Sequence, residues 1–222
     1  MTPLGSFRRS RAARGKPRAA SWIESLLWVL GCAALGYCAF LWGRAQYDQA
    51  QGSRMVDQGR FDVKARPAAG SLVGRIEIPR LKLSAVIFEG TDDRTLYRGV
   101  GHLAGSAVPG KRGNLVLAGH RDTFFASLKN IREGDEIDVT GPGGTFRYMA
   151  GATEIVAPEA TEVLRPTGAA TLTLITCFPF RYVGNAPDRF IVHGKIIGGE
   201  EADSHENAFV SDSQSGSARR GL

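Results

Sequence analysis

Apolar residues in this chain form one long block near the N-terminus and many short blocks after residue 70. The long block, residues 25–43, contains no charged residue, and Trp22 and Trp42 stand near its two ends. At about 1.5 Å of rise per residue, a helix of this length spans the roughly 30 Å hydrocarbon layer of a bilayer. The pattern predicts a transmembrane anchor over residues 22–43, with a tryptophan at each interface.

A cleaved signal peptide is the competing interpretation of this block. Its apolar region is shorter, and a small-x-small cleavage site follows it. Here the run is long and is followed by Arg44 and polar residues, which favours an uncleaved anchor. Residues 1–21 carry six basic and no acidic side chains. By the positive-inside rule, this tail stays in the cytoplasm and the chain from Arg44 onward lies outside the membrane.

The sequence beyond the anchor divides into three parts. Residues 44–70 lack sustained apolar periodicity, which predicts a partly helical or flexible stalk. Residues 71–199 contain short alternating runs typical of strands. The runs cover 73–78, 83–88, 114–118, 135–140, 145–156, 170–176 and 189–197, with short helices expected at 92–98 and 124–131 and one turn at 160–164. Residues 200–222 are polar and acidic, which predicts a disordered tail.

Short strands at close spacing, with no long helix between them, predict an all-β domain, either a closed barrel or a sandwich. A doubly wound α/β fold needs helices of 10 to 15 residues between its strands. The formal net charge of +6 equals the charge of the N-terminal tail, so the rest of the chain is neutral. Nucleic-acid binding by the β-rich domain therefore has no support from charge.

The cysteines narrow the possible chemistry. Cys32 and Cys38 fall inside the apolar helix, so Cys177 is the single cysteine of the exported domain. A lone thiol there is either buried and inert or kept for its reactivity. Cys-x-x-Cys, His-Glu-x-x-His, Gly-x-Ser-x-Gly and phosphate-loop motifs are all absent, so no metal or other cofactor is predicted.

Three residues stand at strand ends and together form a candidate catalytic set. Cys177 closes one predicted strand, His120 follows another, and Arg189 opens the last. If these strands are neighbours, a thiol, a base and a fixed cation meet at one rim. Arg181 competes with Arg189 for the cationic role, but Arg189 lies on a strand, which holds its geometry better.

The other histidines have simpler interpretations. His102 lies in a Gly-rich loop and is interpreted as structural or as a support for the residues of the site. His193 lies inside the last predicted strand and is interpreted as packed or hydrogen-bonded. His205 lies in the polar tail and is expected to be solvated.

Residues 113–128, which include Ala-Gly-His120-Arg, resemble the histidine region of the sortases. Residues 171–177 and 186–192 are similar to the cysteine and arginine strands of that family. Residues 76–79 and 101–110 also fit, so the resemblance covers about residues 72–197, with the class D subgroup nearest.

The resemblance implies a closed, sortase-type β-barrel of about eight strands with short helices, preceded by one transmembrane helix. It implies a cysteine transpeptidase of the bacterial cell membrane that cleaves a C-terminal sorting signal, often of the Leu-Pro-x-Thr-Gly type, after its Thr. Cys177 is then the nucleophile that forms a thioester, His120 the acid and base, and Arg189 the oxyanion stabiliser. The implied partners are exported proteins bearing the signal, an amine acceptor such as a wall peptide or a pilin lysine, and the bilayer.

Three alternatives remain open at this point. A plain extracytoplasmic cysteine protease would release its product to water. The L,D-transpeptidases are exported β-rich cysteine enzymes, but their Ser-x-Gly-Cys-x-Arg-like motif does not match the residues around Cys177. A non-catalytic barrel that only binds peptides is the third. The sorting motif, the acceptor and the choice between anchoring and polymerising proteins are left undetermined.

Overall fold

The computed structural model describes residues 18–61 and 67–199. Most of the predicted cytoplasmic tail, part of the predicted stalk and the predicted disordered C-terminal tail lie outside these residues. By its internal contacts the chain divides into two compact units, with the boundary between Gly43 and Arg44.

The first described element is a single helix, α1 (Arg18–Asp57). It is long and apolar enough to cross a membrane, and its large apolar side chains between Trp22 and Trp42 are exposed. The helix does not end at Gly43 but continues through the first half of the predicted stalk. Nothing in the polar sequence of residues 44–57 indicates a strong apolar stripe, so this continuation was not localised from the pattern.

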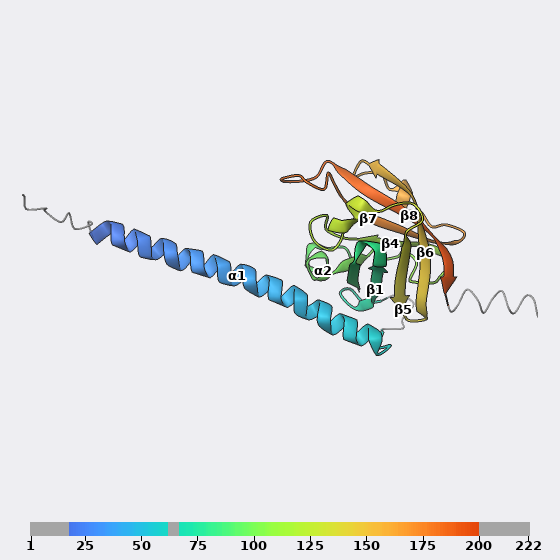
Figure 1. Ribbon diagram of the computed structural model, residues 1–222, viewed down its shortest axis with the longest axis horizontal. Helices are drawn as coiled ribbons and strands as arrows, with labels where there is room; N and C mark the ends of the chain where they lie inside the picture. The colour runs from blue at the N-terminus through green and yellow to red at the C-terminus, as the bar shows by residue number, and fades with distance from the viewer. Residues whose placement is uncertain (1–17, 62–66, 200–222) are drawn as a thin grey trace, which may run out of the picture. The chain divides into compact units, whose positions relative to one another are not determined.

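Eight strands close into a barrel in the order β1-β2-β3-β4-β7-β8-β6-β5 (Figure 1). The bounds are β1 (Leu72–Ile78), β2 (Leu83–Glu89), β3 (Val100–His102), β4 (Gly113–Ala118), β5 (Glu136–Gly141), β6 (Gly144–Val156), β7 (Ala170–Phe178) and β8 (Asp188–Gly199). The predicted closed barrel of about eight strands is confirmed. The alternation predicted seven of the strands, and it missed β3, which at three residues is too short to show a period of two.

Four short helices connect the strands. They are α2 (Asp93–Arg98) and the 3₁₀ helices η1 (Pro79–Leu81), η2 (Ala126–Asn130) and η3 (Glu162–Leu164). Inward-facing aliphatic and aromatic side chains fill the barrel, and Phe125 and Leu128 belong to the same fully buried cluster. Because these two residues lie at η2, this helix covers one end of the barrel.

The strand directions define which residues share that end. β1, β4, β6 and β7 finish there, and β2, β3, β5 and β8 begin there, as their parallel and antiparallel pairings require. We call it the η2 end. It carries the residues after β4 and β7, the first residues of β8, and η1, which follows β1.

The side chain of Gln49 in α1 completes the hydrogen bonding of the barrel wall. β3 begins only at Val100, opposite Ile87, so the N–H of Val86 has no strand partner on that side. The Gln49 Oε1 accepts from the Val86 N–H at 2.8 Å, and its Nε2 donates to the Arg98 carbonyl at 2.6 Å. One amide side chain thus satisfies a donor of β2 and an acceptor at the end of α2 that do not pair with each other.

Packing and charge hold the same segment of α1 to the wall. Gly52 lies so close to β2 that an added Cβ would stand 2.7 Å from Val86 Cγ1. Asp48 accepts from Arg98 at 2.8 Å, and Asp57 pairs with Arg75 of β1 at 2.7 Å. The helical residues from Arg44 to Asp57 therefore belong to the folded barrel unit.

Candidate active site

The register of two parallel strands brings His120 level with Cys177. Ala118 of β4 stands opposite Ile175 of β7, and the Gly119 N–H continues the ladder by donating to the Ile175 carbonyl at 3.0 Å. His120 follows Ala118 by two residues, and Cys177 follows Ile175 by two. The two side chains therefore leave neighbouring segments at the same height.

Arg189 joins this pair from the other side of β7. In the antiparallel ladder of β7 and β8, Cys177 stands directly opposite Arg189. Directly opposed side chains lie on the same face, with Cβ atoms about 4.5–5.5 Å apart. Arg189 Nη1 donates to the carbonyls of Asp188 at 2.9 Å and Ala186 at 3.3 Å. Within the described residues the rest of its guanidinium makes no hydrogen bond, so it can take an incoming oxygen.

The thiol lies on the outer face of the barrel wall. Leu172 and Leu174 point into the core, so the alternation of β7 turns Thr173, Ile175 and Cys177 outward. Cys177 is partly exposed. The connection between β6 and β7 folds over this same face, where Asn114 Nδ2 donates to the carbonyl of Val163 at 3.1 Å.

The backbone of His120 is fixed, while its ring keeps an unused hydrogen-bonding atom. The Phe125 N–H donates to the His120 carbonyl at 3.1 Å. The Phe125 ring packs so closely on Gly119 that an added Cβ there would approach it to 2.7 Å. In contrast, the Nε2 of His120 is buried and has no hydrogen-bond partner in the described part of the chain.

Tyr97 is the aromatic neighbour of this ring. The two ring centroids are 5.4 Å apart at an interplanar angle of 51°. Tyr97 lies in α2, whose N-cap is Asp92, and this carboxylate accepts from the Thr95 hydroxyl at 2.7 Å and from the Thr95 N–H at 3.2 Å. These hydrogen bonds favour the ionised form and hold the pKa of Asp92 below its usual value. A well-capped helix thus presents Tyr97 to His120.

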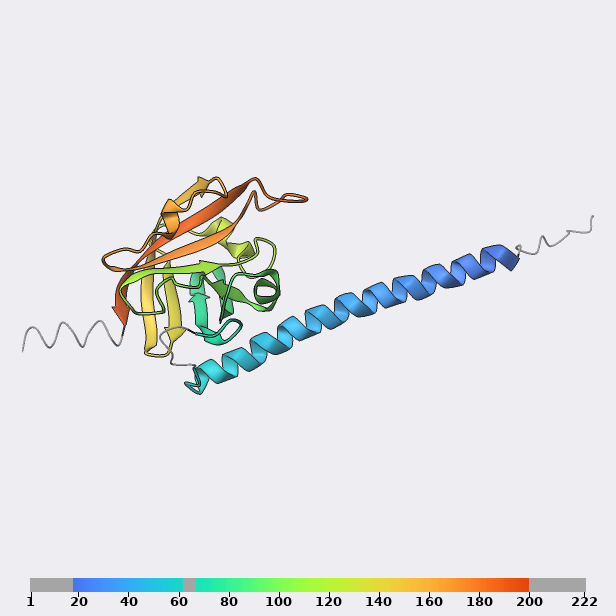
Figure 2. The same cartoon turned by 180° about the vertical axis from the view of Figure 1, so that it is seen from behind.

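Arg121 is a positioning residue that the sequence did not reveal. Its Nη1 donates to the carbonyl of Pro179 at 3.1 Å, and its Nη2 to those of Tyr182 at 2.9 Å and Gly184 at 3.1 Å. The guanidinium also lies 5.7 Å from the Tyr182 ring centroid. The loop that it holds joins β7 to β8 and projects from the barrel (Figure 1 and Figure 2). Its only signal in the sequence is its place beside His120.

The remaining candidates fall outside this cluster. His102 is buried, and its Nδ1 contacts the Glu89 carboxylate, which agrees with the structural role predicted for it. His193 on β8 pairs with Glu154 at 2.7 Å. Arg181 is exposed in the β7–β8 loop. Within the described residues, no group of three or more His, Cys, Asp or Glu side chains is arranged to hold a metal ion.

The comparisons with known proteins agree with this geometry. A family model described as the sortase domain matches residues 76–197. Sortase D of Bacillus subtilis is 38% identical over 151 residues, which cover 67% of this chain and 76% of that protein. Sortase A of Bacillus anthracis is 26% identical over 207 residues, which cover 82% and 97%.

Solved structures give the same result. A sortase D5 transpeptidase of Clostridium perfringens superposes with a TM-score of 0.61 at 25% identity, over 70% of this chain and 99% of that one. Sortase A of Corynebacterium diphtheriae superposes with a TM-score of 0.55 at 27% identity, over 77% and 96%.

Together these matches define a cysteine transpeptidase built on a closed β-barrel. The chain belongs to the sortase family, whose members process surface proteins that bear a sorting signal and join them to amine acceptors. The predicted family and enzyme class are confirmed, and the likeness to a sortase D agrees with the subgroup that the motifs favoured.

Proposed function

We propose that this sortase cleaves a C-terminal sorting signal of the Leu-Pro-x-Thr-Gly type in exported proteins and transfers the acyl part to an amine. Cys177 is the nucleophile, His120 the acid and base, and Arg189 the cation that stabilises the oxyanion. The observation that supports this assignment most strongly is the strand register, which sets His120, just after β4, level with Cys177 of β7 and Arg189 of β8.

The first half of the reaction forms a thioester. The Cys177 thiolate attacks the carbonyl carbon of the signal's Thr, and the oxygen that gains charge is bound by Arg189. The C–N bond of the Thr–Gly peptide then breaks as His120 gives a proton to the leaving amine. The acyl part remains on the Cys177 sulfur.

The second half restores the enzyme. An acceptor amine attacks the thioester carbonyl while His120 takes a proton from its nitrogen. The C–S bond breaks, the new amide leaves, and Cys177 is again a thiolate. The unpaired Nε2 of His120 suits this exchange, because a nitrogen already committed to a protein acceptor is not free to donate or accept.

The anchor has a matching role in this proposal. Residues 22–43 span the cell membrane with the basic tail in the cytoplasm, so the barrel lies on the outer side. Membrane attachment confines enzyme and membrane-held substrate to one layer, which raises their effective concentration. The exposed apolar side chains of α1 between Trp22 and Trp42 support this placement.

A transfer assay tests the assignment. The full chain in nonionic detergent is incubated with a Leu-x-x-Thr-x peptide library and an added amine, and mass spectrometry follows the peptides and the intact protein. We expect an amine-linked product and an acyl adduct on Cys177. In Cys177→Ala both disappear, a loss of at least about 10³-fold, whereas the matched control Cys38→Ala keeps full activity.

Each other result would change the conclusion. Hydrolysed peptide as the sole product, with acceptor amine in excess, would assign the chain's activity to proteolysis rather than transfer. An amine-linked product that persists in Cys177→Ala would remove Cys177 from the mechanism.

A further inference from the structure

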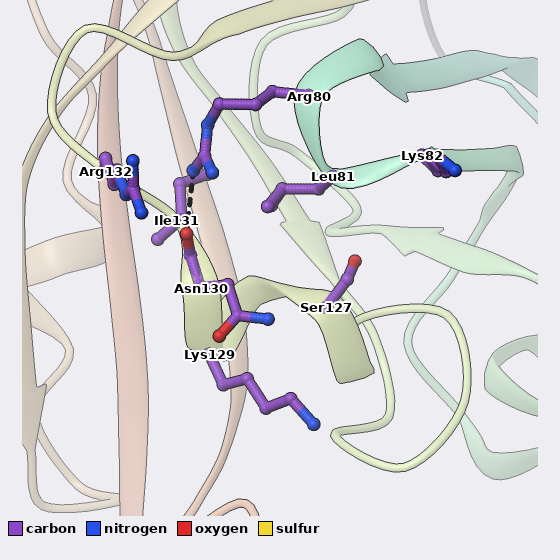
Figure 3. A pocket seen from close by; sticks show the side chains of 8 residues that line it. All are labelled: Arg80, Leu81, Lys82, Ser127, Lys129, Asn130, Ile131 and Arg132. Atoms are coloured by element: carbon purple, nitrogen blue, oxygen red, sulfur yellow. Dashed lines mark hydrogen bonds between the residues drawn. The ribbon is translucent and has the colours of Figure 1, made fainter.

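A hollow of about 540 Å³ lies between η1 and η2, apart from the three proposed catalytic residues. Its walls come from two segments distant in sequence, residues 80–82 on one side and residues 127–132 on the other. Figure 3 shows the side chains of Leu81 and Ser127 directed into the space between the two segments.

The residues that line this hollow are strongly cationic. They include Arg80, Lys82, Lys129 and Arg132 and no acidic residue. Ser127 and Asn130 add a hydroxyl and an amide that can donate hydrogen bonds. Like charges gathered in a concave site repel one another and raise the local positive potential, which favours a bound anion.

One of the four cations is already committed. The Arg80 guanidinium makes a bidentate pair with Asp135 and also donates to the Asn130 carbonyl at 2.7 Å, the bond drawn in Figure 3. These contacts of Arg80 connect the η1 wall of the hollow to the η2 wall and fix the spacing between them. The other three cations, Lys82, Lys129 and Arg132, make no salt bridge within the described residues, although the charge of Arg132 also acts on Asp135.

We propose that the hollow between η1 and η2 binds a phosphate group, either as a free ion or as the headgroup of a lipid. Cations on both walls, together with a hydroxyl and an amide, line the space. A phosphate group has three or four acceptor oxygens, so it can accept from more of these donors at once than a carboxylate with two oxygens can. Two nearby carboxylates limit the charge but do not cancel it, because Asp135 is held by Arg80 and Glu133 lies exposed beside Arg132.

The position of the hollow connects it to the reaction. It lies at the η2 end of the barrel, which also carries His120, Cys177 and Arg189. η2 begins six residues after His120. Phe125, the residue just before η2, donates a hydrogen bond from its N–H to the His120 carbonyl. A phosphate held between η1 and η2 therefore restrains the segment that carries His120. Binding of this phosphate does not depend on the proposed mechanism of acyl transfer.

Calorimetric titration of the full chain in nonionic detergent, at constant ionic strength, tests the proposal. The titrants are inorganic phosphate, the short-chain lipid dihexanoyl phosphatidic acid, and dihexanoyl phosphatidylcholine, which has the same acyl chains but no net charge. The pocket variant is Lys129→Gln/Arg132→Gln. Its matched control, Arg112→Gln/Lys195→Gln, removes the same charge from exposed residues away from η1 and η2. Lys82→Gln serves as a second pocket variant if the double variant melts early.

We expect saturable phosphate binding in the millimolar range, weakened at least tenfold in the pocket variant and unchanged in the control. Phosphatidic acid that binds at least tenfold more tightly than inorganic phosphate, with no binding of phosphatidylcholine, would identify a lipid headgroup as the source. Equal affinities would identify the phosphate group alone. Absence of saturable binding by both phosphates, or equal weakening in the pocket and control variants, would overturn the proposal.

Discussion

Two histidines of this barrel follow or end neighbouring strands, and their surroundings are opposite. His102 ends β3 and is almost completely buried, with 1% of its surface exposed. Its Nδ1 contacts Glu89, and its Nε2 lies 3.0 Å from the Ala107 carbonyl and 2.9 Å from the Ser106 hydroxyl. His120 follows β4, is partly exposed, and has no partner for Nε2 among residues 18–61 and 67–199.

The difference separates a structural histidine from one available for chemistry. Around His102 the protein satisfies both ring nitrogens, which stabilises the fold and leaves neither nitrogen open to a substrate. Around His120 the backbone is equally well held, but the ring nitrogen is unsatisfied, which costs stability and keeps a site for substrate. Substitutions at the two positions should therefore have opposite consequences.

The largest effect on activity is expected at the available histidine. His120→Ala should lower the rate of amine transfer by about 10²–10⁴-fold, because both proton transfers of the proposed mechanism lose their acid and base. The melting temperature should stay within about 2 °C of the wild type, since no side-chain hydrogen bond is lost. Transfer assays and thermal melts on the same preparation check both, with His193→Ala as the control. A strongly destabilised His120→Ala would break the contrast.

The largest effect on stability is expected at the structural histidine. His102→Ala should reduce the free energy of unfolding by roughly 3 kcal/mol, because it leaves the buried Glu89 carboxylate without its partner. For a chain of this size that is a melting temperature lower by about 6–12 °C. Activity per folded molecule should change by less than about threefold below the melting range. If His102→Ala were as stable as the wild type but inactive, His102 would belong to the catalytic machinery.

An intermediate effect on activity is expected at Arg121, which lies beside His120 and donates hydrogen bonds to the loop after Cys177. Arg121→Ala removes three hydrogen bonds to the β7–β8 loop, so the loop that follows Cys177 should move more freely. We expect a roughly tenfold lower kcat/KM and faster proteolysis within residues 179–187, with little change in the melting temperature. Arg121→Lys should recover only part of the activity, since an ammonium cannot reproduce the planar fork. Unchanged cleavage of the loop would refute the positioning role.

The smallest effect is expected at the ion pair of Arg80 and Asp135, at the η2 end of the barrel. The hydrogen bonds from Arg80 hold the pKa of Asp135 below its usual value, ahead of the contribution from the Arg132 N–H. A lowered pKa in the folded state stabilises the fold above the unfolded value of about 4, and this contribution is lost as the pH falls through the folded pKa.

Arg80→Gln should therefore lower the melting temperature by about 2–4 °C near pH 6, and the difference should shrink as the pH drops below about 4. Melting curves between pH 3 and 7 measure it, with the exposed Arg112→Gln as the control. A difference that grows toward low pH would contradict the sign of the Asp135 contribution.

The sequence predicted the parts of this molecule that show alternating apolar and polar residues or that match a family motif. Alternation located seven strands, and their end positions brought Cys177, His120 and Arg189 together as candidates before any pairing was known. The register that supports the set depends on the parallel pairing of β4 with β7, which are separated by more than fifty residues. No local pattern encodes such a long-range pairing.

Other features left no pattern to follow. The docking of α1 depends on the amide of Gln49, on the close approach of Gly52 and on the ion pairs of two aspartates, rather than on an apolar stripe. The hold of Arg121 on the next loop consists of bonds to backbone carbonyls, which carry no side-chain signature. Single polar contacts of this kind are specified by the fold and not by periodicity.

The bridge made by Gln49 has a consequence for proteolytic cleavage of the chain near α1. The folded catalytic unit begins at Arg44, inside α1. A protease that cuts between Asp57 and Leu72 therefore releases a barrel that lacks the helical residues 44–57. The shed fragment exposes the Val86 N–H and the apolar surface once covered by the helix, an open edge that invites self-association. A cut just before Arg44 would instead liberate an intact enzyme. The point of cleavage thus decides whether the fragment keeps or loses the helical residues that complete its wall.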